Sequence, residues 1–159
     1  MHLCGAAVRL STFTDYSLRL LMYLAAEPRR RVTIAQVAQA FGISENHLTK
    51  VAHGLGRQGW LANVRGHGGG LALAVAPRQI VIGEVVRRTE NGDRPAACFA
   101  AEGPAACAIG GACGLRGALE EAMQAFYRVL DRITVADLVL EPQTLSRLQF
   151  IAPPPAASA

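Results

Sequence analysis

The stretch TIAQVAQAFGISENHLTKVAHGLGRQGWLANVRGHGGG, residues 33–70, decides the fold. Thr33 can cap a short helix that has an apolar stripe, and Gly42 can end that helix. Only Ile43 then separates it from Ser44, which can cap another helix. Two helices joined by such a tight, glycine-containing turn are typical of the helix-turn-helix motif.

The helix after Ser44 has one apolar and one polar face. Leu48, Val51 and Leu55 share the face that would pack inward. The other face suits DNA, because Asn pairs with adenine, Lys binds guanine or phosphate, and a helix N-terminus favours phosphate. An ordinary solvated helix face is the alternative. The residues that we expect to contact DNA from this helix and its cap are Ser44, Asn46, His47, Thr49, Lys50 and His53.

The next segment predicts a β-hairpin, which would be the wing of a winged helix. Residues 60–64 and 71–73 have strand composition, and a glycine-rich turn joins them. Such a turn, which carries Arg65 and His67, lets the backbone approach the duplex closely and can bring a cation to a minor groove. A phosphate-binding loop is the alternative, but the Lys-Ser/Thr pair of a P-loop and the helix after its glycines are missing.

Charge is divided unevenly along the chain. Residues 1–92 hold 11 Lys and Arg against 5 Asp and Glu, whereas residues 93–159 hold 5 against 7. A basic first part and a mildly acidic second part indicate a polyanionic partner for the first part. We therefore expect double-stranded DNA as the partner, and we include Arg9 among the residues that contact it.

The bulk composition predicts a soluble, cytoplasmic protein with a hydrophobic core. The chain has 159 residues, half of them apolar. No apolar run approaches the roughly 18 residues of a membrane helix, and Arg19 interrupts the stretch 18–26. The first residues also lack the apolar region of a secretory signal, so we expect no membrane partner.

The remaining pattern is helical. Thr14 can cap a first helix that ends near residues 27–28, and a fourth helix is expected at about 82–89. The buried stripe predicted for the first helix consists of Leu18, Leu21, Met22 and Ala25. Thr134 can cap a last short helix at 135–140, and the tail from Pro142 has the composition of a disordered segment.

A long amphipathic helix is predicted at 115–132. Its apolar stripe consists of Leu115, Leu119, Ala122, Met123, Phe126, Leu130 and Ile133. A stripe of this kind near the end of a small DNA-binding protein often forms a homodimer interface. The alternative is that it closes the core of the monomer.

Three cysteines, Cys98, Cys107 and Cys113, lie in a loop rich in Gly, Ala and Pro, with gaps of eight and then five residues. In a reducing compartment such thiols are more often metal ligands or reactive groups than disulfides. An iron–sulfur cluster, structural zinc and a thiol redox switch are the candidate roles. Neither gap is as short as the Cys pairs of zinc sites, which weakens zinc. Cys4 lies in the seven-residue lead and is discounted.

Several motifs in order resemble the Rrf2 family of transcription regulators. They are VRLSTFTDY (8–16), NHLTKV (46–51), VRGHGGG (64–70) and the three-cysteine loop. Within the match, CAIGGACGLRGAL (107–119) and TVADLV (134–139) look most like the nitric-oxide-sensing branch of the family. The resemblance covers residues from about 8 to 140.

The resemblance implies a homodimeric repressor, not an enzyme, that leaves its operator when its cluster is nitrosylated. It implies one iron–sulfur cluster per subunit, with 4Fe–4S expected ahead of 2Fe–2S, held by Cys98, Cys107 and Cys113. Asp15 matches a residue that the other subunit donates as a fourth ligand in some relatives. Its ordinary role would be that of an acidic residue in the first turn of a helix.

Two departures keep other family branches open. The first gap in the cysteine loop is longer than in most relatives, which leaves an iron-responsive regulator possible. Arg116 stands where the redox-responsive cluster-assembly regulators have a His ligand, which favours the nitric-oxide branch. A zinc- or thiol-based winged-helix interaction protein is the alternative from another class.

We therefore expect a mostly α-helical chain with three parts. They are a winged helix-turn-helix domain at 8–90, a cysteine-bearing loop with a C-terminal dimerisation helix at 91–140, and a disordered tail at 141–159.

Overall fold

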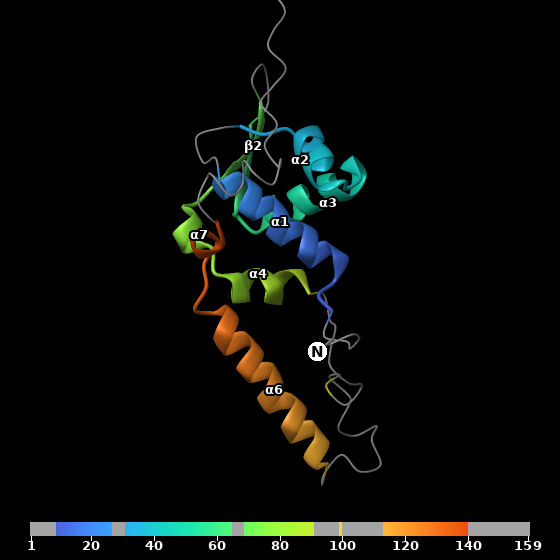
Figure 1. The fold of residues 1–159 in the computed structure, drawn as a ribbon, viewed down its shortest axis with the longest axis vertical. Coiled ribbons are helices and arrows are strands. Elements are labelled where there is room, and N and C mark those ends of the chain that lie inside the picture. The colour runs from blue at the N-terminus through green and yellow to red at the C-terminus, as the bar shows by residue number, and fades with distance from the viewer. Residues whose placement is uncertain (1–8, 27–30, 65–68, 91–98, 100–112, 140–159) are drawn as a thin grey trace, which may run out of the picture.

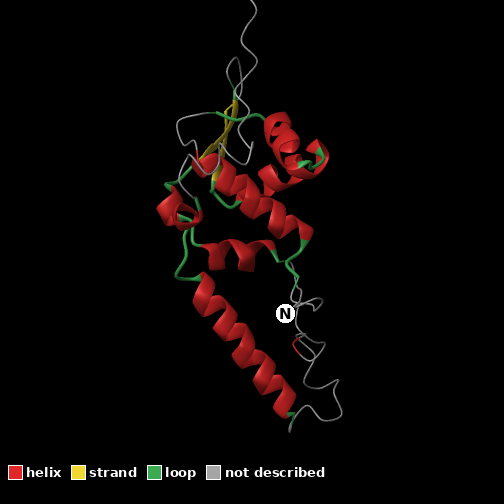
Figure 2. Ribbon diagram, in the orientation of Figure 1, coloured by secondary structure: helices red, strands yellow, loops and turns green. Residues whose placement is uncertain are grey.

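The computed structural model describes residues 9–26, 31–64, 69–90, 99 and 113–139 (Figure 1). These residues form a mostly helical structure with one small sheet, as predicted (Figure 2). The elements, in chain order, are α1 (Thr12–Ala26), α2 (Ile34–Phe41), α3 (Glu45–Arg57), β1 (Leu61–Val64), β2 (Gly70–Leu73), the 3-10 turn η1 (Pro77–Gln79), α4 (Ile82–Thr89), α6 (Gly114–Leu130) and α7 (Val135–Leu138).

The helix-turn-helix begins and ends at the predicted residues. The Gln36 N–H donates to Thr33 Oγ1 at 3.2 Å, and Gln36 Oε1 accepts from the Thr33 N–H at 2.9 Å, which closes a capping box on α2. Gly42 ends α2 at φ +63°, a conformation that favours glycine. The Ser44 hydroxyl oxygen then accepts from the His47 N–H at 3.3 Å and caps α3.

The prediction that Thr14 caps α1 is wrong. Thr14 lies inside the first turn and is fully buried. Ser11 takes the capping role, since its hydroxyl oxygen accepts from the Thr14 N–H at 3.2 Å and its carbonyl accepts from the Asp15 N–H at 3.0 Å. Both residues are good caps by type, and only the packing of Thr14 against α4 selects between them.

The buried face of α1 is also wider than predicted. Leu21 and Ala25 are buried as expected, but Leu18 and Met22 are only half-buried. Leu20 and Leu24 are buried instead, at 0% and 1% exposure. The physical reason is that α1 packs against α3, α4, α7 and β2 together, so that more than one stripe faces the core.

The predicted hairpin forms, and a third segment joins it. Strands β1 and β2 pair antiparallel, with Leu61 opposite Leu73. Val32, which precedes α2, exchanges two backbone hydrogen bonds with Leu71, at 3.1 and 2.7 Å. A Cβ at Gly70 would lie 3.0 Å from the Val32 carbonyl oxygen, so this approach is easiest for glycine.

Helix α6 projects from the rest of the described structure. Figure 1 shows it extending away from the other helices, with only its C-terminal end beside α4. None of its residues is buried, and Leu115 and Val129 are 65% and 60% exposed. Near its end, Phe126 and Leu130 pack against the core.

Helix α7 is shorter than predicted and begins after Thr134 as expected. The Asp137 carboxylate accepts hydrogen bonds from the backbone N–H and the hydroxyl of Thr134, at 2.8 and 2.7 Å. The predicted disordered tail at 141–159 lies outside the described residues. Within the segments that are described, no helix combines the length and apolarity needed to cross a bilayer.

Candidate DNA interface and cluster site

Helix α3 separates a buried and an exposed side, as predicted. Leu48, Val51 and Leu55 are at most 1% exposed and pack into the core. The polar residues expected to contact DNA are all exposed: Ser44, Asn46, His47, Thr49, Lys50 and His53. The fold therefore presents this polar set on the surface, where a duplex could reach it.

Half of these six polar side chains are not used inside the described part of the protein. The hydroxyls of Ser44 and Thr49 bind the backbone of α3, and the His47 ring centroid lies 6.3 Å from that of Tyr16. Three side chains have no hydrogen-bond or ion-pair partner in the described part of the chain: Asn46, Lys50 and His53. Their donors and acceptors are available to base edges and phosphates.

The other predicted DNA-contacting residues are placed only in part. Arg9 is exposed and lies just ahead of α1. Arg65 and His67 lie outside the described residues. The strands that flank them are described, so the position of the wing beside α3 follows from β1 and β2.

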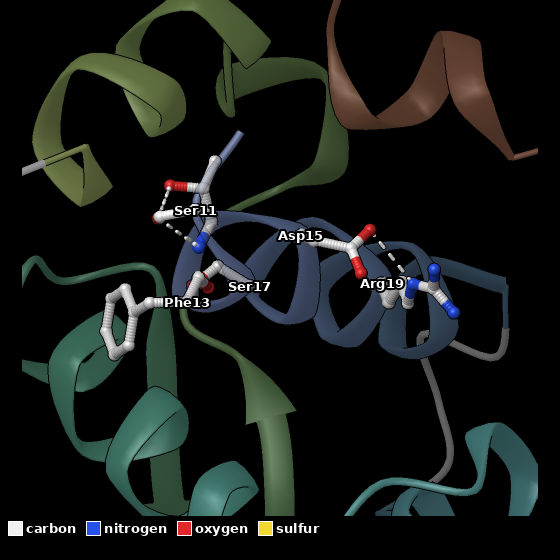
Figure 3. Close-up of polar contacts among 6 residues, drawn as sticks. Ser11, Phe13, Asp15, Ser17 and Arg19 are labelled. Carbon is white, nitrogen blue, oxygen red and sulfur yellow. Dashed lines mark hydrogen bonds and ion pairs between the residues drawn. The ribbon is translucent and has the colours of Figure 1, made fainter. Parts of the chain in front are cut away.

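Asp15 projects from the first turn of α1 toward Arg19. Its Oδ1 accepts from Arg19 Nε at 3.0 Å, and the two side chains are 43% and 46% exposed (Figure 3). No hydrogen bond to the second carboxylate oxygen, Oδ2, occurs within the described segments. A half-exposed carboxylate with one oxygen available can be reached by a group from another subunit.

Of the three loop cysteines, Cys113 alone is among the described residues. It is the N-cap residue of α6, is half-buried, and forms no disulfide. A helix N-terminus favours an anionic ligand. Cys98 and Cys107 lie outside the described residues. No group of three metal-ligating side chains therefore occurs among the residues that are described, and the ligand set stays a prediction.

One contact connects the two flanks of the cysteine loop. The Arg116 guanidinium carbon lies 5.8 Å from the centroid of the Phe99 ring. Phe99 follows Cys98 in the sequence, and Arg116 lies in the first turn of α6 after Cys113. The contact thus joins a residue of the loop to the first turn of α6.

Sequence reasoning missed the contacts that hold α4 to its neighbours. The Ser11 N–H donates to Glu90 Oε1 at 2.7 Å, and Arg87 forms an ion pair with Asp131. These partners are 79 and 44 residues apart in the sequence, and no local pattern indicates them.

Curated relatives match nearly the whole chain. One, from Shouchella clausii, is named HTH-type transcriptional regulator NsrR and is 46% identical over 145 residues, covering 90% of this chain and 97% of its own. A protein of the same name from Bacillus subtilis is 44% identical over 142 residues, covering 89% and 97%. The relatives are thus transcription regulators, not enzymes.

Solved structures show the same fold. IscR of T. potens matches with a TM-score of 0.67 and 25% identity, covering 84% of this chain and 87% of its own. CymR, the global cysteine regulator of B. subtilis, matches with a TM-score of 0.67 and 26% identity, covering 84% and 97%. The likeness to these two structures, together with the helices and the hairpin described above, confirms the predicted fold class.

The family model that matches is Rrf2, described as an iron-dependent transcriptional regulator, over residues 10–141. Together with the winged helix and the exposed face of α3, this match shows that the chain belongs to the Rrf2 family of DNA-binding transcription regulators.

Proposed function

We propose that this protein is a dimeric, iron–sulfur-dependent repressor that leaves its operator in response to nitric oxide. The observation that carries the proposal is the position of Cys113. Its unbridged thiol stands at the start of α6, where the three-cysteine loop meets the helix that we assign to dimerisation. The relatives named NsrR and the motifs of the nitric-oxide-sensing branch support the same function.

DNA would be bound by α3 and the wing. Asn46 and Lys50 lie opposite the buried stripe of α3 and can contact base edges in a major groove. Arg65 and His67 would contact the adjacent minor groove, and Arg9 the backbone. Two such units in a dimer would bind a pseudo-palindromic operator with half-sites about one helical turn apart.

A second copy of this chain is the proposed partner of α6. The helix buries none of its residues within one subunit, although its stripe is apolar. Leu115 is 65% exposed at the end of the helix that extends away from the core. A large apolar side chain held in water at the end of a 17-residue amphipathic helix is best explained by burial against the same helix of another subunit.

The donor set fits an iron–sulfur cluster. Three cysteine thiolates, from Cys98, Cys107 and Cys113, are the ligand type that such clusters use, and Asp15 from the partner subunit would complete the set. When bound, the cluster would supply iron that reacts with nitric oxide. In this arrangement Arg19 holds the Asp15 carboxylate by one oxygen and leaves the other for ligation.

Ligand binding by the cysteines would stabilise one arrangement of the loop. The loop follows α4 and precedes α6, so its order affects how the winged helix is held relative to the dimerisation helix. Loss of ligation lowers the population of the arrangement that fits the operator. The chain would in this way couple the state of its thiols to DNA affinity.

The test is anaerobic purification followed by operator binding. We expect iron and acid-labile sulfide in the protein, broad absorption in the blue, and an operator affinity that falls at least about tenfold after exposure to nitric oxide. A colourless, zinc-loaded protein with the same operator affinity would overturn the proposal. The second candidate function is that of an iron- or redox-responsive regulator, which the similarity to IscR favours. It would be supported if DNA binding changed with iron supply or oxidants and did not respond to nitric oxide.

A further inference from the structure

The first turn of α1 is bound to the last turn of α4 by a chain of hydroxyl groups. The Thr14 hydroxyl donates to Thr89 Oγ1 at 2.9 Å, and the Thr89 hydroxyl donates to the Val85 carbonyl at 2.7 Å. Since each hydroxyl has one proton, the 3.0 Å contact between Ser11 and Thr14 requires Ser11 to be the donor. Thr14 and Thr89 are 0% and 3% exposed, so the chain is shielded from water.

Glu90 strengthens this junction. Its Oε1 accepts from the Ser11 N–H at 2.7 Å, directly at the end of α4. The cysteine loop begins after this residue. The end of α4 and the start of α1 are therefore directly joined at this residue.

The same turn of α1 contacts α3 through Phe13. A Cβ at Gly54 would lie 2.8 Å from the Phe13 Cζ atom, a distance that real Cβ atoms do not show. Glycine inside a helix is less favourable than alanine, so the ring contact explains a residue that α3 would otherwise disfavour. Figure 3 shows Phe13 pointing toward α3, while Asp15 and Arg19 project elsewhere on α1.

The backbone at Phe13 is fixed and its ring borders an open space. The Ser17 hydroxyl donates to the Phe13 carbonyl at 2.7 Å. Beside the ring is a cleft of about 290 Å³, lined by Phe13, Gly54, Arg57, Gln58, Arg88 and Thr89. The Phe13 ring is therefore not enclosed by protein on every side.

We propose that Phe13 is a positioning residue that transmits the state of the cysteine loop to α3. The loop acts on Glu90 and Thr89, these hold Ser11 and Thr14, and the Phe13 ring then fixes α3 through Gly54. This inference rests on the proposed function, because it requires DNA affinity to depend on the cluster. It does not require Asp15 to be a ligand.

The experiment measures operator affinity for the cluster-loaded and the cluster-free dimer of four proteins. They are wild type, Phe13→Leu, Gly54→Ala and the double variant. We expect each single variant to keep the wild-type iron content and visible spectrum while the ratio of the two affinities falls about tenfold. In the double variant the shorter leucine makes room for the methyl group at 54, and the ratio should recover by at least half.

Backbone hydrogen exchange gives a readout that does not depend on DNA. Cluster loading should increase protection of the amides of α3 in wild type and leave them unchanged in Phe13→Leu. Ile34→Val is the control, since Ile34 is a partly buried apolar residue at the start of α2 and is not part of the junction of α1 with α3 and α4. It should keep both the affinity ratio and the exchange response.

The outcomes separate the two proposals. Single variants that retain the wild-type ratio, or that lose affinity equally with and without cluster, would overturn the role of Phe13, because an equal loss indicates only a structural contact. A wild-type protein whose operator affinity is the same in both forms would overturn the proposed function itself, and with it this inference.

Discussion

Arg87 of α4 donates hydrogen bonds to both carboxylate oxygens of Asp131, at 2.7 and 2.6 Å. Its guanidinium carbon also lies 4.2 Å from the centroid of the Tyr127 ring. Asp131 directly follows α6, so this pair joins the winged helix to the base of the helix that we assign to dimerisation. An arginine and a carboxylate joined by two parallel hydrogen bonds fix the direction of α6 better than apolar contact alone.

The pair predicts a pH-dependent contribution to stability. The hydrogen bond from Arg87 lowers the pKa of Asp131, so the ionised carboxylate stabilises the fold above the unfolded-state pKa of about 3.9, and this contribution is lost as the pH falls through the lower folded-state pKa. Asp131→Asn should therefore reduce Tm slightly at about pH 7, and the difference should shrink as the pH falls below the unfolded-state pKa of about 3.9. Thermal unfolding across this pH range measures it.

Glu120→Gln is the control for that experiment, because Glu120 is an exposed acid of α6 with no ion pair among the described residues. It should leave Tm unchanged at both pH values. If Asp131→Asn lowered Tm by the same amount at the acidic end of the range, the loss of stability could not be assigned to this ion pair.

Gly83→Ala should destabilise the protein although alanine favours helices. The added Cβ would lie 2.0 Å from Asp131 Oδ1 and 3.1 Å from the Asp131 backbone nitrogen, so the ion pair and the end of α6 must shift. Overpacking of this kind costs about 1–3 kcal/mol. Urea unfolding should show the loss, and Asp131→Ala in the same chain should reduce it, since the nearest clashing atom is then gone.

The matched control is Gly117→Ala. A Cβ at Gly117 meets no atom within 4 Å, and the residue is exposed in α6. This change should stabilise the fold by up to about 1 kcal/mol through helix propensity. If Gly83→Ala and Gly117→Ala changed the free energy of unfolding in the same direction and by the same amount, the proposed clash between residue 83 and Asp131 would be contradicted.

Lys50→Ala and Asn46→Ala should weaken operator binding without changing the fold. Both side chains are exposed and lack partners within the described residues, and a lost base contact costs about 1–3 kcal/mol. Operator titrations should show the loss, and wild-type affinity should fall steeply with salt. Arg128→Ala is the control for charge alone, because Arg128 is exposed on α6, away from α3. Unchanged operator affinity in both α3 variants would show that this face of α3 does not bind the operator.

Each of Cys98→Ala, Cys107→Ala and Cys113→Ala should abolish stable cluster binding. A site with three thiolates has no spare ligand. Iron content after anaerobic reconstitution measures the effect, and Cys4→Ala serves as the control that keeps its iron. A wild-type iron level in Cys98→Ala would show that the long first gap of the loop has changed the ligand set.

Asp15→Ala should keep a cluster with altered circular dichroism and an altered rate of reaction with nitric oxide. A carboxylate oxygen binds iron more weakly than thiolate does, so its loss changes the cluster environment without releasing the cluster. Glu45→Ala is the control, because Glu45 is an exposed acid in the first turn of another helix, α3, and its loss should leave the spectra unchanged. Spectra of Asp15→Ala that match wild type would limit Asp15 to its ordinary role as a first-turn acid of α1.

Local pattern was sufficient for most elements of the fold. Thr33, Gly42 and Ser44 are caps whose effect depends on the nearest backbone groups, and the structure has them at the predicted positions. The apolar period of α3 also assigned its buried and exposed sides correctly, because one stripe of that helix packs inward. The bounds of α4 agree with the prediction for the same reason.

Tertiary structure decided what local pattern left open. Ser11 and Thr14 are both suitable caps by type, and the buried hydrogen bond from Thr14 to Thr89 leaves the capping role to Ser11. The ion pair of Arg87 and the contact of Phe13 with Gly54 likewise join residues that are distant in the sequence. Capping and amphipathic periodicity act within a few residues of the chain, whereas these contacts exist only after α1, α3, α4 and α6 have packed together.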